Sequence, residues 1–248
     1  MTNSCPFLTV VIPAYNEEER LEPTLREVFA FLSAQSFTWE LIVVDDGSTD
    51  KTAELATQIF KEIPGNTKLL SNPGNRGKGY SVRSGMLEAQ GQWVLMSDAD
   101  LSTPIEEVLK LLKSSAEFPV VIGSRGMKES LLEERQPLYR ETMGRIFNLM
   151  VQTIALPGIR DSQCGFKLFR GDAAKSVFSR MTIEGFGFDV ECLFVARRLG
   201  YEIGEVPIRW INHPASKVHA VRDSARMAGD LFKVRVRHRN TGKNGEEN

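Results

Sequence analysis

Residues 41–50 read LIVVDDGSTD, and residues 93–104 read WVLMSDADLSTP. In both stretches a short apolar or β-branched run, typical of a buried strand, leads directly into a loop of acidic and turn-forming residues. Similar runs at Leu8–Ile12, Lys68–Leu70 and Val120–Gly123 predict further strands, and amphipathic stretches between the runs predict helices near residues 18–33, 51–62, 77–89 and 105–117. This alternation predicts an α/β fold with a mostly parallel sheet flanked by helices.

The regular alternation ends after Ser124. Downstream we expect an apolar helix at Leu138–Leu156, a strand at Phe166–Phe169, a helix at Asp189–Leu199, a strand at Glu202–Trp210 and a basic helix near residues 222–236. No linker rich in Gly, Pro or Ser divides the chain. We therefore expect one domain over residues 1–240, with parts 8–125 and 126–240 organised differently, and a disordered tail at 241–248.

Two helix starts carry capping signals. Thr103 can cap the helix near residue 105, with Pro104 at the first helical position and Glu106 completing a capping box. Ser48 or Thr49 can cap the helix near residue 51.

The composition excludes several classes of protein. The 248 residues carry 31 basic and 32 acidic side chains, a net charge of −1, so no global field favours nucleic acid. Cys5, Cys164 and Cys192 are widely spaced, which argues against a disulfide framework or a thiolate zinc site and favours a reducing compartment. Neither a signal peptide nor an apolar run of about 20 residues is expected, so the protein should be soluble or lie on a membrane surface.

The acidic loops are the first candidates for chemistry, because ligands of parallel α/β sheets bind beyond the carboxyl ends of the strands. Asp98 and Asp100 project to one side if the backbone is extended, and two such carboxylates suit Mg²⁺ or Mn²⁺. The alternative is that they form Asx-turns or start a helix. Asp45 and Asp46 either form a turn or accept hydrogen bonds from a base or ribose.

The glycine-rich segment NRGKG at residues 75–79 allows close approach of a ligand to the backbone at a helix start. Arg76 and Lys78 would place positive charge beside that ligand. The alternative is a solvated turn.

Three motifs together are more specific than any one of them. VVIPAYNEEERL (10–21), IVVDDGSTDKT (42–52) and NRGKGYSVRSGMLEAQGQWVLMSDADLSTP (75–104) occur in this order. They resemble the GT-A fold nucleotide-sugar glycosyltransferases of the inverting family 2. Within it, IRDSQCGFKLF (159–169), EGFGFDVE (184–191) and the Ser216-Lys217 pair resemble the polyprenyl- and dolichyl-phosphate hexosyltransferases. The QCGFKLF stretch is most similar to the branch of dolichyl-phosphate β-glucosyltransferases.

The resemblance implies a GT-A, Rossmann-like fold in which residues 8–125 bind the nucleotide sugar and 126–240 the acceptor. It implies that Asp98 and Asp100 hold Mg²⁺ or Mn²⁺ at the donor phosphates. The donor would contact Pro13, Tyr15, Glu17, Asp45, Asp46, Lys78 and Asp98. The expected reaction moves a hexose, favouring glucose from UDP-glucose, onto a polyprenyl or dolichyl phosphate. GDP-mannose as donor, a glycan or other hydroxyl as acceptor, and a non-catalytic nucleotide-sugar binder are the alternatives.

A phosphate acceptor is largely a dianion at neutral pH and can attack without a general base. Cations are then expected beside it, and the candidates are Arg125, Arg140 and Lys217. Asp189 either caps a helix or orients the sugar or a cation, and it would become the base if the acceptor were a hydroxyl. The expected catalytic residues are thus Asp98, Asp100, Arg125 and Asp189. Lys167 is expected to pair with an acid in this region.

Two segments predict peripheral attachment to the cytoplasmic face of a membrane. One is the apolar helix at 138–156. The other spans 217–239, where seven Lys or Arg outnumber two Asp, a local net charge of +5. The alternative is that the apolar faces of both helices pack on the core. Nucleic acid is disfavoured because no aromatic residues are interleaved with the charges. The sequence does not predict the oligomeric state.

Overall fold

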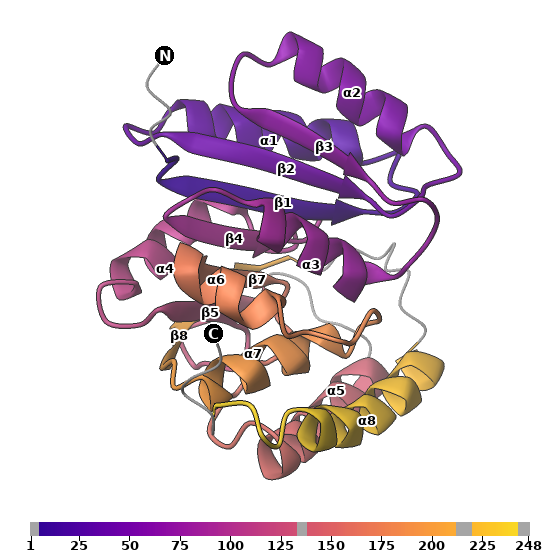
Figure 1. Cartoon of the computed structure of the whole chain (residues 1–248), viewed down its shortest axis with the longest axis vertical. Helices are drawn as coiled ribbons and strands as arrows, with labels where there is room; N and C mark the ends of the chain where they lie inside the picture. Colours follow the sequence, from indigo (N-terminus) through magenta and orange to yellow (C-terminus); the bar gives the residue numbers. More distant parts are fainter. Residues whose placement is uncertain (1–4, 133–137, 212–219, 243–248) are drawn as a thin grey trace.

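The computed structural model describes residues 5–132, 138–211 and 220–242. A seven-stranded sheet in the order β3-β2-β1-β4-β7-β5-β8 runs through the molecule (Figure 1). Only β7 runs antiparallel to its neighbours. The strands are β1 (Leu8–Ala14), β2 (Trp39–Asp45), β3 (Thr67–Ser71), β4 (Trp93–Ser97), β5 (Val120–Ser124), β7 (Phe166–Arg170) and β8 (Ile203–Pro207).

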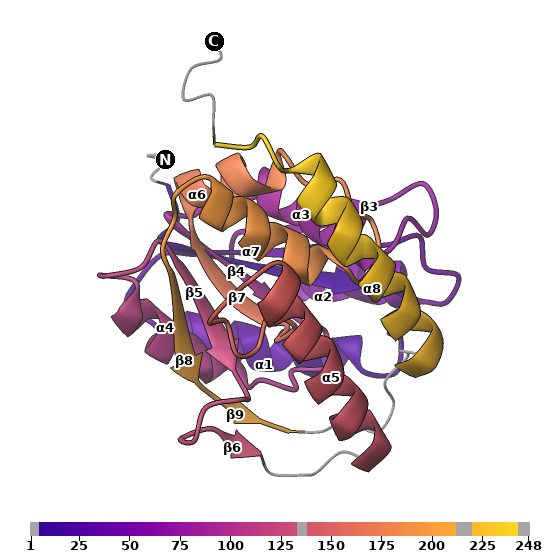
Figure 2. The same cartoon turned by 90° about the horizontal axis from the view of Figure 1, so that it is seen from below.

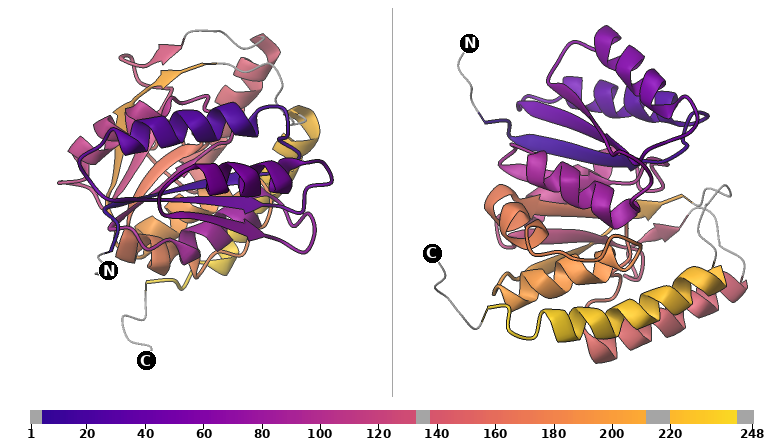
Figure 3. Two further views of the ribbon diagram at one scale, coloured as in Figure 1. Left: turned by 90° about the horizontal axis from the view of Figure 1, so that it is seen from above. Right: turned by 45° about the vertical axis from the view of Figure 1, so that its right-hand side comes forward.

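Helices cover both faces of this sheet (Figure 3). On one face lie α1 (Leu21–Ser33), α2 (Thr52–Glu62) and α4 (Val108–Ser114), which follows the 3-10 turn η1 (Ile105–Glu107). On the other face lie α3 (Lys78–Glu88), α5 (Leu138–Ile154), α6 (Gly171–Phe178), α7 (Phe188–Arg198) and α8 (Ala220–Arg237). A separate two-stranded sheet pairs β6 (Leu131–Leu132) with β9 (Arg209–Trp210).

Successive side chains along each strand face opposite sides of the sheet and contribute to two separate hydrophobic cores. In β1, Val11 faces the core under α3, whereas Val10 and Ile12 face the core under α1 and α2. All three are fully buried, as expected for a parallel sheet covered on both faces. The parallel register also brings Ala14 of β1 opposite Asp45 of β2. The loops after β1 and β2 therefore leave the same edge of the sheet.

The predicted strands and helices are found, with boundaries shifted by a few residues. The exception is the strand predicted at Glu202–Trp210, which is divided into β8 and β9, and these belong to different sheets. The antiparallel direction of β7 and the helix α6 were not predicted. The capping predictions were wrong. Pro104 precedes η1, Lys51 precedes α2, and neither helix start has a side-chain capping bond. Arg198 Nε donates to Thr241 O at 3.1 Å and holds the first residue of the expected tail, whereas residues 243–248 lie outside the described ranges.

The helices α5 and α8 pack side by side at one end of the molecule (Figure 2). Phe147 and Val151 of α5 and Leu231 and Val234 of α8 are buried in the core beneath them. Among the described residues, no helix is both long and apolar enough to cross a bilayer.

Candidate active site

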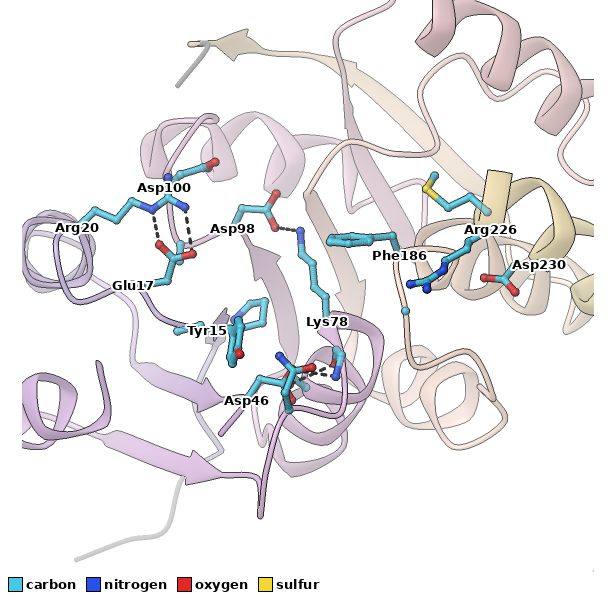
Figure 4. Close-up of a pocket in the computed structure, with 18 residues that line it drawn as sticks. Tyr15, Glu17, Arg20, Asp46, Lys78, Asp98, Asp100, Phe186, Arg226 and Asp230 are labelled. Carbon is cyan, nitrogen blue, oxygen red and sulfur yellow. Dashed lines mark hydrogen bonds and ion pairs between the residues drawn. The ribbon is translucent and has the colours of Figure 1, made fainter. Parts of the chain in front are cut away.

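A cleft of about 570 Å³ opens where β1 and β4 end (Figure 4). Its size suits a small-molecule substrate. Its walls come from the loops after β1, β2 and β4, the start of α3, the loop before α7, and α8. Seven of the residues predicted from the sequence line it, namely Pro13, Tyr15, Glu17, Asp46, Lys78, Asp98 and Asp100. Asp45, Arg125 and Asp189 do not appear in its walls.

The loops after β1 and β2 hold each other in place. Asn16 adopts a left-handed conformation with φ of 53°. Its side chain accepts the Thr49 N–H at 2.8 Å, and its own N–H donates to Ser48 Oγ at 2.9 Å. The hydroxyl of Ser48 thus binds the neighbouring loop instead of capping α2. These bonds fix the backbone on which Tyr15 and Glu17 reach the cleft.

Asp46 shapes the glycine-rich segment. It is 3% exposed, and its carboxylate accepts the backbone N–H groups of Arg76 at 3.0 Å and Gly77 at 2.8 Å. Gly77 has φ of 103°, and a Cβ there would lie 2.5 Å from Glu184 O. Asp46 therefore holds the glycine-rich loop in place at the start of α3. The neighbouring Asp45 is buried and accepts the Ser48 N–H at 3.2 Å.

Asp98 and Asp100 both reach the cleft, but not by the geometry that we expected. The strand β4 ends at Ser97, and the backbone then turns, with Leu101 at φ of 46° and its N–H bonded to Asp98 O at 3.2 Å. Asp100 also accepts the Ser102 N–H at 2.9 Å. The Asx-turn alternative and the cleft-lining role thus both hold for Asp100.

Lys78 faces Asp98 across the cleft (Figure 4). Its Nζ lies 2.7 Å from Asp98 Oδ1, and both side chains remain partly exposed, at 27% and 31%. Burial alone would lower the pKa of Lys78, but the carboxylates of Asp98 and Asp189 outweigh it and raise that pKa above its ordinary value. The first residue of α3 thus keeps a positive charge beside the paired acids.

Gly165, in the QCGFKLF stretch, leaves room for Asp98. A Cβ at this position would lie 2.0 Å from Asp98 Oδ2. Any side chain here would push the carboxylate out of its place, which gives a physical reason for glycine beside the cleft.

The donor set of the cleft fits a hard divalent cation. Asp98 Oδ1 is buried and, apart from the ion pair with Lys78, has no hydrogen-bond partner within the described ranges. Asp100 supplies a second carboxylate to the same cleft. The described residues hold no group of three or more His, Cys, Asp or Glu placed for a metal. Two carboxylates leave coordination positions for water and for substrate phosphates, as Mg²⁺ requires.

Asp189 is engaged in the interior. Its carboxylate pairs with Lys167, whose side chain is fully buried and also donates to Cys164 O at 2.5 Å. Burial raises the pKa of Asp189, and the charges of Lys167 and Lys78 oppose that shift. The predicted pairing of Lys167 is confirmed. The predicted N-cap role is wrong, because Gly187 precedes α7 and Asp189 forms no capping bond.

Of the predicted acceptor cations, Arg125 can be placed, and it does not line the cleft. Arg125 forms a two-pronged ion pair with Asp161, at 2.7 and 2.8 Å, and lies over the ring of Trp210. Burial of Arg125 alone would lower its pKa, but the carboxylate of Asp161 outweighs this effect and raises that pKa above its ordinary value. Arg140 lies in α5, but its side chain is outside the description, and Lys217 falls outside the described residues altogether.

Sequence reasoning missed several cleft residues. Arg20 pairs with Glu17, with Nη2 and Oε1 3.0 Å apart. Phe186, Arg226 and Asp230 complete the side toward α8. Arg20 directly follows the NEEE motif, which was an available signal. Phe186 lies within the EGFGFDVE stretch, which was also a signal. Arg226 and Asp230 come from α8, and only folding brings α8 to the cleft.

Comparisons with known proteins identify the family of this chain. Residues 9–178 match the model of the Glycosyl transferase family 2. The chain is 39% identical over 244 residues to a dolichyl-phosphate beta-glucosyltransferase of Trichomonas vaginalis, covering 94% of this chain and 74% of that protein. It is 34% identical to the human dolichyl-phosphate beta-glucosyltransferase, covering 93% and 75%.

Solved structures support the fold. Glucosyl-3-phosphoglycerate synthase from Mycobacterium tuberculosis, in complex with Mn²⁺, UDP-glucose and glycerol 3-phosphate, superposes with a TM-score of 0.66 at 19% identity. The match covers 94% of this chain and 80% of that chain. Mannosyl-3-phosphoglycerate synthase from Rubrobacter xylanophilus gives 0.68 at 20% identity, covering 98% and 77%. The predicted GT-A fold is confirmed.

Proposed function

The chain belongs to glycosyltransferase family 2, and we propose that it transfers glucose from UDP-glucose to dolichyl phosphate at a membrane surface. The observation that carries the proposal is the cleft in which Asp98, Asp100 and Lys78 meet beside Tyr15 and Glu17. The relatives from Trichomonas vaginalis and human, similar over nearly the whole chain, support glucose and dolichyl phosphate as the substrates.

We assign the donor's diphosphate to the end of the cleft that holds Asp98 and Asp100. There the two carboxylates would hold Mg²⁺ or Mn²⁺, which neutralises negative charge on the leaving UDP. Lys78 adds a fixed positive charge on the same side. The backbone at 75–77, held by Asp46, offers N–H groups near the start of α3. Tyr15 and Glu17 lie on the wall available to the nucleoside.

The reaction then depends on correct positioning of the two substrates and needs no proton transfer from the acceptor. An oxygen of the acceptor phosphate attacks C1 of glucose from the face opposite UDP, and the C1–O bond to UDP breaks with its electron pair leaving on UDP. The acceptor is largely dianionic at neutral pH, so no base has to remove a proton. The chain's task is to align the two substrates and to stabilise charge on the leaving group.

The side chains of α5 and α8 support a membrane surface as the place of reaction. Ile146 and Leu149 on α5, and Phe232 and Val236 on α8, are each more than half exposed. Residues 226–239 carry five Lys or Arg against Asp230 alone. Exposed apolar side chains next to cations suit the headgroup region of an anionic membrane.

The rival with a hydroxyl acceptor is less well supported. That reaction requires a base within reach of the acceptor. Asp189 is tied to Lys167 and does not line the cleft, and Glu191 is fully buried and accepts bonds from Thr182, Ile183 and His238. Neither acid is placed to remove a proton in the cleft.

The test is transfer of radiolabelled glucose into the organic phase from UDP-glucose, with Mn²⁺ or Mg²⁺ and dolichyl phosphate. We expect a β-linked product, loss of activity with chelator, and a drop of about 100-fold or more for Asp100→Asn. Glu19→Gln, an acid on the same loop as Tyr15 but outside the cleft walls, is the matched control. Transfer from GDP-mannose alone would refute the donor assignment, and transfer only to hydroxyl acceptors would refute the acceptor.

A further inference from the structure

The helix α8 carries three kinds of side chain on separate faces. Met227, Leu231 and Val234 are buried against the core. Phe232 and Val236 are exposed, at 61% and 67%. Arg226 and Asp230, one helical turn apart, line the cleft. One helix thus joins the cleft to the exposed apolar surface.

Arg226 differs from the other cations of the cleft. Arg20 is paired with Glu17, and Lys78 with Asp98. The nearby Asp230 is taken by Lys233, at 2.8 Å. Among the side chains that the structure describes, none forms an ion pair or a hydrogen bond with the guanidinium of Arg226. Its charge and its planar set of donors are therefore available to an anionic ligand, and this set matches two phosphate oxygens at once.

The position of Arg226 separates it from the paired acids. Figure 4 shows its side chain entering the cleft from α8, on the side opposite Asp98 and Asp100, with Phe186 and Lys78 between. In an inverting displacement the attacking oxygen and the leaving diphosphate lie on opposite faces of the sugar. A diphosphate held near Asp98 and Asp100 therefore leaves the side of Arg226 for the attacking phosphate.

We propose that Arg226 binds the phosphate of the acceptor lipid, while the lipid chain follows the exposed apolar side chains of α8 and α5. The inference rests on the proposed function. Arg125, which the sequence predicted for the acceptor phosphate, is paired with Asp161 and does not line the cleft. Arg226 is a positioning residue for the attacking oxygen, since the phosphate needs no proton removed.

The experiment is steady-state kinetics of the full chain with UDP-glucose, Mn²⁺ and dolichyl phosphate in vesicles. For Arg226→Gln we expect the KM for dolichyl phosphate to rise about 10- to 100-fold, the size of a lost charged hydrogen-bond pair. The Kd for UDP-glucose with Mn²⁺, measured by calorimetry, should change less than about twofold. Arg226→Lys should recover part of the loss, because charge remains but the two-pronged contact does not.

Arg239→Gln is the matched control, because it removes the same charge beyond the end of α8 and away from the cleft. It should leave the KM for the acceptor unchanged once vesicle binding is equal. An unchanged acceptor KM in Arg226→Gln, or a weakened UDP-glucose Kd in its place, would overturn the inference. Absence of any glucosyl transfer by the wild-type chain would instead refute the proposed function. Because Arg226 is exposed, we expect Arg226→Gln to melt at the same temperature as the wild type. An equal melting temperature excludes misfolding as the cause of a raised KM.

Discussion

At the scale of single residues, Asp189, a predicted catalytic residue, forms a buried ion pair with Lys167 that contributes to the stability of the fold. Both side chains are nearly removed from solvent. Removing one partner of such a pair leaves an uncompensated buried charge, which typically costs about 3–5 kcal/mol. A loss of activity in an Asp189 variant can therefore arise from folding alone.

We expect Asp189→Asn to lower the free energy of unfolding by about 3–5 kcal/mol, measured by urea denaturation. The double variant Lys167→Met/Asp189→Asn should recover most of that loss, because no buried charge remains. Each folded molecule of the double variant should retain substantial glucosyl transfer. The ion-pair explanation would be contradicted if the losses of unfolding free energy in Asp189→Asn and in Lys167→Met simply added in the double variant.

At the scale of elements, Glu191 joins α7 to its surroundings. It is fully buried and accepts the N–H groups of Thr182 and Ile183, at 3.0 and 2.8 Å, and it lies 2.8 Å from His238 Nε2 just beyond α8. Burial alone would raise the pKa of Glu191, but these hydrogen bonds lower it below its ordinary value of 4.5. The carboxylate thus ties the C-terminal end of α8, the helix that supplies Arg226, to the rest of the molecule.

This lowered pKa gives the stability a defined pH dependence. Ionised Glu191 stabilises the fold fully above pH 4.5, and that contribution is lost as the pH falls below 4.5 toward the folded-state pKa. Glu191→Gln should be less stable than the wild type by about 1.5–3 kcal/mol near neutral pH, measured by urea denaturation. The difference in unfolding free energy between the wild type and Glu191→Gln should narrow as the pH falls below 4.5. A constant difference across the range would contradict the assignment.

At the scale of the whole molecule, the end formed by α5 and α8 is the surface proposed to meet the membrane. Ile146 and Phe232 are 56% and 61% exposed, and each would contribute about 1.5–3 kcal/mol if fully buried in lipid. We expect Ile146→Ser/Phe232→Ser to bind phosphatidylserine-containing vesicles at least about tenfold more weakly in a sedimentation assay.

The control for that variant is Leu109→Ser on α4, an exposed leucine on the helix layer across the sheet. It should bind vesicles as the wild type does. Equal binding by the α5/α8 double variant and the wild type would place the membrane contact elsewhere. Binding that depends only on phosphatidylserine would assign it to the cations instead.

The sequence by itself determined the α/β class, the positions of the first five predicted strands along the chain and the three acidic or glycine-rich loops. These follow from local periodicity and from the rule that parallel strands present their ends at one edge. The strand-end rule pointed to Asp46, Asp98 and Asp100, and the glycine-rich segment pointed to Lys78. Pro13, Tyr15 and Glu17 were instead expected from the resemblance to family 2, and all seven line the cleft.

Only the tertiary structure decided which charges meet. It paired Arg125 with Asp161 and Lys167 with Asp189, it inserted β7 antiparallel between β4 and β5, and it brought Arg226 to the cleft. An ion pair depends on distance in space, and Lys167 and Asp189 are 22 residues apart in the chain. Strand direction likewise depends on the neighbours that a strand meets in the folded sheet, such as β4 and β5 on either side of β7, which no short stretch of sequence encodes.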